Sequence, residues 1–241
     1  MHLKRVTLFP SRYPTRDYYP FSVPVLQHTR DITFEAPVTF FVGENGSGKS
    51  TLLEAVSHAC GIYIWREPER TRVNQNPYEE TFHKYLSVEW RDGKVPGSFF
   101  GSGIFRHFTQ LVDEWAAADP GQLTYYGGKS LITQSHGESF LSFFRNRYRI
   151  KGLYLLDEPE TALSPRSQLA LLEILTETSE AGSAQFVIAT HSPILLACPR
   201  ALIYSFDYSP IKTVQYEETE HYRIYRDFIE DRTKYLKNGV R

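Results

Sequence analysis

Cysteine, methionine and long apolar runs are all scarce in this chain of 241 residues. Its two cysteines, Cys60 and Cys198, are too few for a disulfide framework and form no Cys-x-x-Cys pair, so we expect two small, buried apolar side chains. No run approaches the roughly 18 apolar residues that span a bilayer, and the opening MHLKRVTLF lacks the apolar core of a signal peptide. These absences predict a soluble, cytoplasmic protein with no membrane insertion.

A large excess of either charge is also missing, because the net charge is −1. Such a chain has no general attraction to nucleic acid. One basic cluster, RNRYRIK from Arg145 to Lys151, has the composition of a phosphate-binding surface. A solvated helix end, where cations favour the negative pole of the helix dipole, is the alternative that we favour. Nucleic acid therefore stays open as a partner.

Strand and helix patterns alternate along the chain, which predicts one α/β domain over residues 1–241. In residues 1–61 the runs LKRVTLF, DITFEA and VTFFVG predict strands, with an antiparallel portion at the N-terminus. KSTLLEAVSHAC then predicts a helix that follows a glycine-rich loop. The order strand, glycine loop, helix is the first functional signal.

The pattern of predicted elements in residues 62–131 differs from that of their neighbours and predicts an inserted subdomain. KYLSVEW and VPGSFF flank the turn RDGK and predict a β-hairpin, and GIFRHFTQLVDEWAAA predicts a helix. Residues 132–241 return to the α/β pattern, with a helix at GESFLSFFRNRY, a buried strand at GLYLLDEPE and a helix between Ser164 and Gly182. AQFVIATHSP, ALIYSFD and VQYEE predict strands, and the C-terminus looks helical. We expect a mixed or parallel central sheet flanked by helices.

The glycine-rich loop GENGSGKS matches the pattern G-x-x-x-x-G-K-[ST] between a predicted strand and a predicted helix. Glycines let backbone N–H groups turn toward phosphate oxygens, and the helix N-terminus adds partial positive charge. Lys49 is expected to reach the β- and γ-phosphates, and the Ser50 hydroxyl to ligate Mg²⁺. A chance glycine turn would lack this context. The predicted nucleotide-binding residues are Gly43, Glu44, Asn45, Gly46, Ser47, Gly48, Lys49, Ser50 and Thr51.

Two carboxylates follow the buried run LYLL. Asp157 ends the predicted strand, where it would lie beside the phosphates and hold Mg²⁺. Glu158 comes next, and a carboxylate there can orient and deprotonate the attacking water. The alternative is a solvated acidic turn before a proline, which four preceding apolar residues disfavour.

His191, in ATHSP, ends another predicted buried strand. A histidine at this position can hydrogen-bond the γ-phosphate or the attacking water, so we assign it a catalytic role with Glu158 and Lys49. A lone histidine is more often structural. Its place at the same expected sheet edge as the phosphate loop favours the catalytic role.

Together GENGSGKST, SHGES, LLDEPETALSP and ATHSP resemble, in order, the motifs of the ABC-type ATPases. The residues within these motifs are most similar to those of the non-transporter branch, which includes RecF-like and SMC-type ATPases and stand-alone bacterial "AAA family" ATPases. The resemblance covers residues 43 to 193. It implies a P-loop NTPase fold of the ABC type, with ATP and Mg²⁺ as cofactors and ATP hydrolysis as the activity.

In that family the segment that SHGE resembles is the signature motif, which caps the γ-phosphate of ATP bound to a second subunit. Ser135 offers a hydroxyl, Gly137 permits close backbone approach, and Glu138 completes the segment. The resemblance therefore implies a head-to-tail, ATP-dependent homodimer, in which Thr161 to Ser164 cross between subunits. His136 departs from the usual glycine. No Q-loop glutamine or adenine-stacking aromatic side chain is assigned.

Three functions remain open from the sequence. The first is an ATPase whose dimerisation switches an unidentified effector protein, in DNA repair or phage defence. The second is the ATPase subunit of a membrane transporter. The signature-like segment argues against it, because it does not read Leu-Ser-Gly-Gly-Gln. The third is a nucleotide-gated binding module with little hydrolysis, against which Glu158 argues. The EETEHY segment suggests a metal site, but we favour a solvated turn there.

Overall fold

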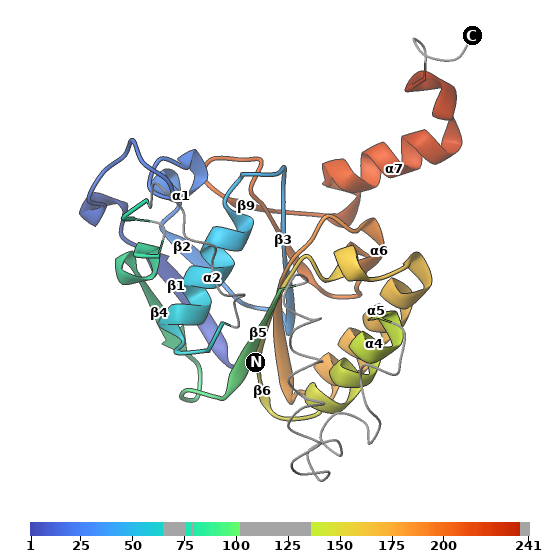
Figure 1. Ribbon diagram of the computed structural model, residues 1–241, viewed down its shortest axis with the longest axis horizontal. Coiled ribbons are helices and arrows are strands. Elements are labelled where there is room, and N and C mark those ends of the chain that lie inside the picture. Colours follow the sequence, from blue (N-terminus) through green and yellow to red (C-terminus); the bar gives the residue numbers. More distant parts are fainter. Residues whose placement is uncertain (65–75, 79, 102–135, 237–241) are drawn as a thin grey trace.

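The protein forms two β-sheets with helices on both faces of the larger one, in a computed structural model that describes residues 1–64, 76–78, 80–101 and 136–236 (Figure 1). The smaller sheet is antiparallel, in the order β2-β1-β4. The larger has the order β5-β6-β7-β3-β8-β9, parallel except for β9. The expected α/β fold with a mixed sheet and an antiparallel portion is confirmed. The strands are β1 (Leu3–Leu8), β2 (Asp31–Thr33), β3 (Val38–Val42), β4 (Leu86–Trp90), β5 (Gly97–Gly101), β6 (Gly152–Asp157), β7 (Ala184–Ala189), β8 (Leu202–Ser205) and β9 (Lys212–Val214).

The helices form where caps and apolar spacing predict them. Ser164 caps α5 by accepting a hydrogen bond from the Ser167 backbone N–H, and Gly182 takes a positive φ of 74° just beyond its end. The signature-like segment opens α4, as predicted. The α-helices of the described chain are α1 (Pro24–His28), α2 (Lys49–Ala59), α4 (His136–Arg147), α5 (Pro165–Glu180), α6 (Pro193–Leu196) and α7 (Glu220–Glu230).

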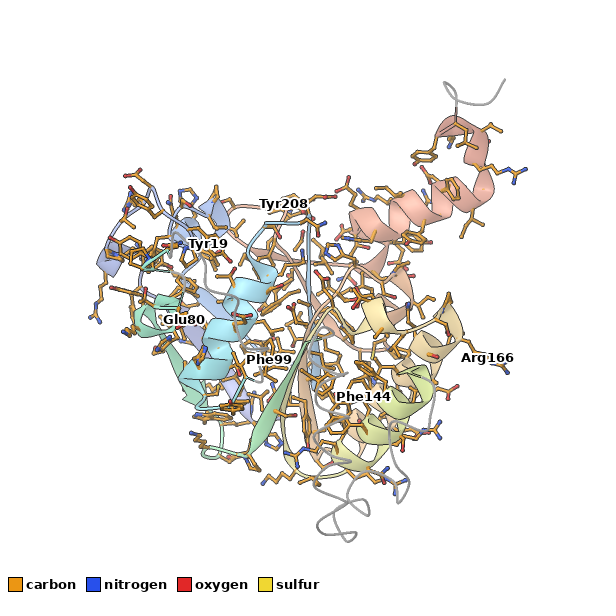
Figure 2. The ribbon with its side chains drawn as sticks, in the orientation of Figure 1. Tyr19, Glu80, Phe99, Phe144, Arg166 and Tyr208 are labelled. Carbon is orange, nitrogen blue, oxygen red and sulfur yellow. The ribbon has the colours of Figure 1, made fainter. Side chains whose placement is uncertain are left out.

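The central sheet separates two apolar cores because its strands are buried on both faces. Phe41 of β3 joins the core shared with α2 and the small sheet, and Phe40 joins the core under α4 and α5. Figure 2 shows the same division on the edge of the sheet, where Phe99 lies toward α2 and Phe144 lies in α4. Cys60 and Cys198 are buried free thiols, as predicted.

The predicted hairpin between KYLSVEW and VPGSFF is wrong. β4 pairs with β1 in the small sheet, and β5 pairs with β6 in the central sheet. Burial alternates along β4, as expected for a strand with one solvated face. In β5 the consecutive residues Phe99 and Phe100 are both buried, which requires cover on both faces. The predicted helix GIFRHFTQLVDEWAAA lies outside the described residues, and the boundaries of an inserted subdomain at 62–131 stay a prediction.

The predicted strand VQYEE is also wrong in part. β9 ends at Val214, and Tyr216–Glu218 form a 3-10 turn. Gln215 and Glu218 close a capping box around that turn, which stops the strand. α7 follows directly.

Tyr148 of the basic cluster is buried in the core, stacked on Phe144 at a centroid distance of 4.8 Å. Arg145 and Arg147 end α4, as the helix-end interpretation expects. No described helix is long and apolar enough to cross a membrane.

Candidate functional site

The carboxyl ends of four parallel strands, β3, β6, β7 and β8, meet at one edge of the central sheet. The loop after β3 turns there with positive φ at Gly43 (140°), Gly46 (79°) and Gly48 (99°). A Cβ added at Gly43 would lie 2.9 Å from Asp207 Oδ1, so only glycine fits this close approach. The loop therefore follows a tight backbone path at the sheet edge that glycine makes possible.

Lys49 lies inside this loop, with only 4% of its surface exposed. Its Nζ donates hydrogen bonds to the carbonyl oxygens of Gly43 (2.7 Å) and Glu44 (2.9 Å). Burial lowers the pKa of Lys49, and the nearby carboxylates, Glu158 first, act in the opposite direction. The ammonium is thus held by groups that a phosphate can replace.

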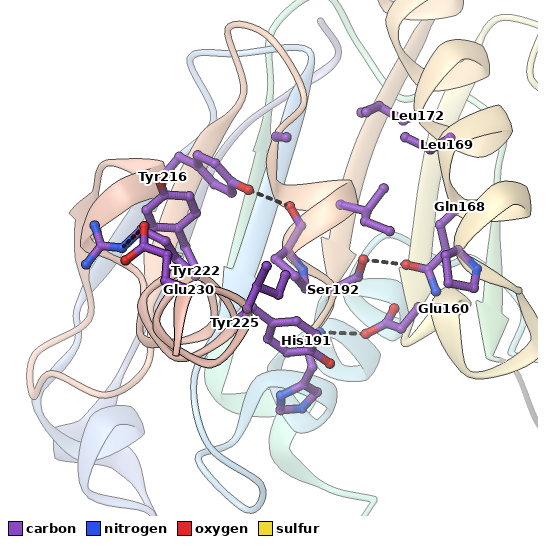
Figure 3. A pocket seen from close by; sticks show the side chains of 16 residues that line it. Glu160, Gln168, Leu169, Leu172, His191, Ser192, Tyr216, Tyr222, Tyr225 and Glu230 are labelled. Atoms are coloured by element: carbon purple, nitrogen blue, oxygen red, sulfur yellow. Dashed lines mark hydrogen bonds and ion pairs between the residues drawn. The ribbon is translucent and has the colours of Figure 1, made fainter. Parts of the chain in front are cut away.

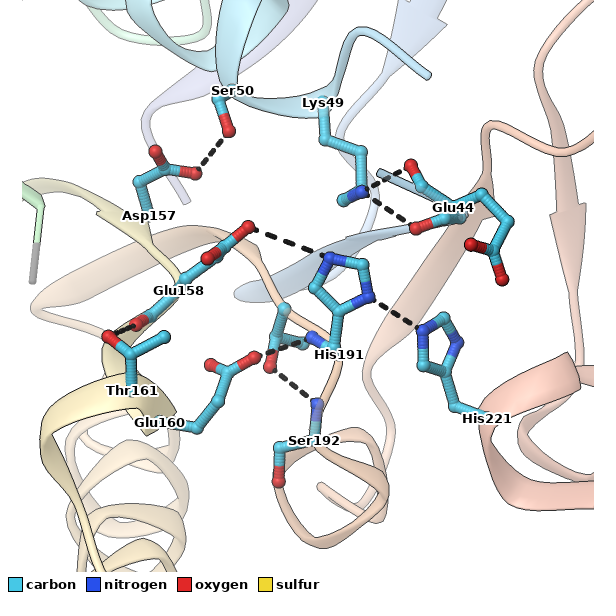
Figure 4. Close-up of polar contacts among 12 residues, drawn as sticks. Glu44, Lys49, Ser50, Asp157, Glu158, Glu160, Thr161, His191, Ser192 and His221 are labelled. Carbon is cyan, nitrogen blue, oxygen red and sulfur yellow. Dashed lines mark hydrogen bonds and ion pairs between the residues drawn. The ribbon is translucent and has the colours of Figure 1, made fainter. Parts of the chain in front are cut away.

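Ser50 and Asp157 meet directly across the sheet edge (Figure 4). The Ser50 hydroxyl donates a 2.8 Å hydrogen bond to Asp157 Oδ1. Burial raises the pKa of Asp157 to about 6, and the Ser50 hydrogen bond opposes that rise. One hydroxyl and one carboxylate oxygen so placed are ligands of the type that Mg²⁺ prefers.

Glu158 has the left-handed backbone φ of 47°, which is uncommon for a residue with a side chain. Its N–H donates to the Ala189 carbonyl (2.9 Å), and its carbonyl accepts from the Thr161 hydroxyl (2.9 Å). These bonds direct its carboxylate back toward the loop, where Oε1 lies 3.6 Å from His191 Nε2. Unusual backbone of this kind clusters at functional sites.

His191 is held from two sides. Its backbone N–H donates to Glu160 Oε1 at 2.6 Å, and its ring nitrogen Nδ1 lies 2.8 Å from Nε2 of His221. Burial is the main cause that lowers the pKa of His191, and Lys49 lowers it further. Both causes favour the neutral form of the imidazole.

The comparisons with known proteins agree with this geometry. A "Putative ABC transporter ATP-binding protein TTE0246" from Caldanaerobacter subterraneus is 32% identical over 200 residues, covering 72% of this chain and 77% of that relative. The chain belongs to the ABC-type ATPase family. A "Putative ABC transporter ATP-binding protein" from Methanosarcina acetivorans is 31% identical over 174 residues, covering 62% of this ABC-type ATPase and 61% of that relative. The chain thus spans less than two thirds of the archaeal relative's length.

Two family models each match a part of this ABC-type ATPase, and solved structures share its fold. A model described as "AAA domain" matches residues 21–89, and one described as "AAA domain, putative AbiEii toxin, Type IV TA system" matches residues 140–197. The SMC head domain from Thermotoga maritima superposes with a TM-score of 0.50 at 19% identity, covering 89% of this chain and all of that domain. At that identity the likeness shows the fold. The expected resemblance to a P-loop ATPase of the ABC type is confirmed.

The structure gathers most of the residues predicted for the site. Lys49, Ser50, Asp157, Glu158 and His191 all lie at one sheet edge, as Figure 4 shows. The rest of the loop frames them. Glu44 donates its N–H to Asp207 (2.9 Å), Ser47 has a buried hydroxyl without a partner in the described chain, and Thr51 bonds the Tyr19 hydroxyl, while Asn45 is exposed.

The signature-like segment is only partly described. α4 begins at His136 and includes Gly137 and Glu138 in its first turn. Ser135 and the side chains at 136–139 lie outside the described residues. Their predicted contact with ATP in a second subunit stays a prediction.

Sequence reasoning did not assign two residues of this ABC-type ATPase site. Asp207 follows β8 and accepts the Glu44 N–H, which the parallel pairing of β8 with β3 explains. The strand run ALIYSFD, ending in an acid, was the available signal. His221 belongs to the EETEHY segment, for which the sequence favours a solvated turn, and its ring contacts His191.

Proposed function

We propose that this protein binds Mg-ATP in the loop from Gly43 to Thr51 and hydrolyses it. The observation that carries the proposal is the direct Ser50–Asp157 hydrogen bond with Glu158 and His191 beside it. A hydroxyl–carboxylate pair suited to Mg²⁺, a second carboxylate and an imidazole lie at one edge of the sheet, next to a loop of turned backbone. A metal site, a phosphate-binding loop and a group that orients the attacking water are the parts that phosphoryl transfer to water uses.

The roles follow from the chemistry of each group. Lys49 exchanges its two carbonyl contacts for the β- and γ-phosphate oxygens. Ser50 and Asp157 would hold Mg²⁺, which would neutralise charge on the phosphate oxygens. Glu158 accepts a proton from the attacking water, and His191 donates a hydrogen bond toward the γ-phosphate. The Ser47 hydroxyl, which is buried and has no hydrogen-bond partner among the described residues, is a further donor toward the phosphates.

We further propose that two chains share each ATP. Ser135, Gly137 and Glu138 of one subunit would close on the γ-phosphate held by the other, through the N-terminal end of α4. ATP then promotes dimerisation, and hydrolysis releases it. The dimer switches an unidentified effector protein, in DNA repair or in defence against phage.

Two variants test ATP binding and hydrolysis separately. Lys49→Ala is expected to lose ATP binding, measured by calorimetry with Mg-ATP, because the buried ammonium is the charge that meets the phosphates. Exposed Lys84→Ala, in the turn after Thr81, is the matched control and should bind as wild type does. Equal ATP affinity in Lys49→Ala and wild type would overturn the site assignment.

Glu158→Gln is expected to bind ATP while phosphate release falls at least about 100-fold, since the general base is lost. A wild-type rate in Glu158→Gln would show that this carboxylate is not the base. Tight ATP binding by the wild-type protein without turnover would favour the nucleotide-gated binding module instead.

A further inference from the structure

His221 lies outside the four motifs that define the ATP site, on the first turn of α7. Its Nε2 is 2.8 Å from Nδ1 of His191, and the ring centroids are 4.9 Å apart (Figure 4). The outer nitrogens of the pair, Nε2 of His191 and Nδ1 of His221, are buried and have no hydrogen-bond partner in the described part of the chain. Within the described residues, the shared contact is thus the hydrogen bond that orients the His191 ring.

The position of the shared proton follows from the surroundings. The two facing ring nitrogens, 2.8 Å apart, can hold only one proton between them, and burial lowers the pKa of both rings, which favours neutral imidazoles with one N–H each. Nε2 of His191 faces the Glu158 carboxylate at 3.6 Å. A proton on Nε2 is attracted to that carboxylate, whereas a lone pair there is repelled. Nδ1 of His191 must then accept the hydrogen bond, and Nε2–H of His221 must donate it.

The start of α7 is built into the domain beside His191. Thr219 is 3% exposed; its hydroxyl accepts from the Tyr222 N–H and donates to the Tyr216 carbonyl. The Tyr216 hydroxyl donates to the carbonyl of Pro193 at 3.0 Å, two residues after His191 (Figure 3). Farther along, α7 lines a cavity of about 700 Å³ that separates it from α5. The first turn, which carries His221, is therefore the attached part of the helix.

We propose that His221 is a positioning residue that holds His191 in the tautomer with its proton on Nε2, directed at Glu158 and the phosphate end of the site. This inference rests on the proposed ATPase function for its kinetic consequence. In the other tautomer, His191 would present a lone pair to the carboxylate and to the phosphate, and could donate to neither. Loss of His221 is expected to lower kcat about 3- to 10-fold, the effect of one hydrogen bond, with little change in KM.

The tautomer can be measured without any turnover. Side-chain ¹⁵N NMR of the nucleotide-free wild-type protein distinguishes imidazoles protonated on Nε2 from those protonated on Nδ1, and His191→Gln identifies the signal. We expect His191 protonated on Nε2, and His221→Ala should shift its population toward Nδ1. A wild-type His191 protonated on Nδ1, or a tautomer unchanged in His221→Ala, would overturn the proposal.

Two conservative variants separate positioning from mere structure. The amide nitrogen of glutamine reaches the place of His221 Nε2, and that of asparagine falls short. We expect His221→Gln to restore kcat and His221→Asn to resemble His221→Ala. In a His191→Ala background the His221→Ala change should have no further effect, since it acts through that ring. Exposed Ile224→Ala on α7 is the fold control.

Each failure points to a different conclusion. No hydrolysis by the wild-type protein would contradict the proposed function, while the NMR result would still decide the tautomer. Normal hydrolysis with undiminished kcat in both His221→Ala and His221→Asn would contradict the positioning role alone.

Discussion

Burial sets the protonation of Asp157 before any nucleotide arrives. Its carboxyl lies at the end of a strand whose other residues are buried, and its pKa rises from 3.8 to about 6. Ionisation therefore costs the folded state free energy that the unfolded chain does not lose. The cost grows as pH rises from about 4 to 6 and is complete above the folded pKa. A bound divalent cation would offset it, which couples metal binding to stability.

We predict that Asp157→Asn stabilises the nucleotide-free protein at pH 8, by on the order of 2 kcal/mol, while it abolishes hydrolysis. The amide still accepts the Ser50 hydrogen bond but never ionises. Thermal unfolding in chelator, between pH 4 and pH 8, should show the gain over wild type increasing across pH 4 to 6. Exposed Asp92→Asn, between β4 and β5, should show no such trend. A variant less stable than wild type at pH 8 would contradict this account.

Residues whose roles depend on sheet-edge motifs could be predicted from the sequence, and those that approach from elsewhere could not. Ser50 and Asp157 meet because parallel strands end at one edge, which the strand–loop–helix pattern already implies. His221 reaches His191 from a helix that follows a 3-10 turn, and no local pattern fixes that approach. The role of Asp207 follows from the pairing of β8 with β3, which the sequence does not display.

At the scale of elements, the strands were predicted well and their partners were not. A Gly-containing turn between β4 and β5 favours a hairpin locally, and burial on both faces of β5 overrides it. Strand pairing is decided by long-range cover, which a single sequence does not display. Long-range contacts also decide the joint between the two sheets, which a single sequence does not display either.

Part of that joint is made by Gln185, a fully buried polar residue of β7. Its Oε1 accepts from the backbone N–H groups of His2 and Leu3, and its Nε2 donates to the Leu3 carbonyl at 3.0 Å. Gln185→Ala leaves three backbone groups without these partners, so we predict a loss of about 2 to 5 kcal/mol in the free energy of unfolding. Urea titration measures it, with exposed Glu173→Ala on α5 as control. A midpoint equal to that of wild type would show that the sheets do not depend on this link.

At the scale of the whole molecule, we propose that a second chain completes the ATP site. The loop, the Ser50–Asp157 pair and the Glu158–His191 pair all come from one sheet edge (Figure 4). The signature-like segment stands instead at the start of α4, which packs with α5.

Ser135→Arg tests the role of that segment. We predict that the variant binds ATP as a monomer but neither dimerises nor hydrolyses it, because a long cation would occupy the place of the γ-phosphate's cap. Glu177→Arg, at an exposed position of α5, controls for an added arginine. Phosphate release at the wild-type rate in Ser135→Arg would contradict the shared site.

The most direct test of the shared ATP site is the solution mass of Glu158→Gln with and without Mg-ATP, measured by light scattering after size exclusion. With hydrolysis blocked, ATP should accumulate between subunits and convert the monomer to a dimer of about twice the 27.9 kDa chain mass. Lys49→Ala in the same background should stay monomeric. A Glu158→Gln protein that binds ATP tightly and remains a monomer would contradict the account.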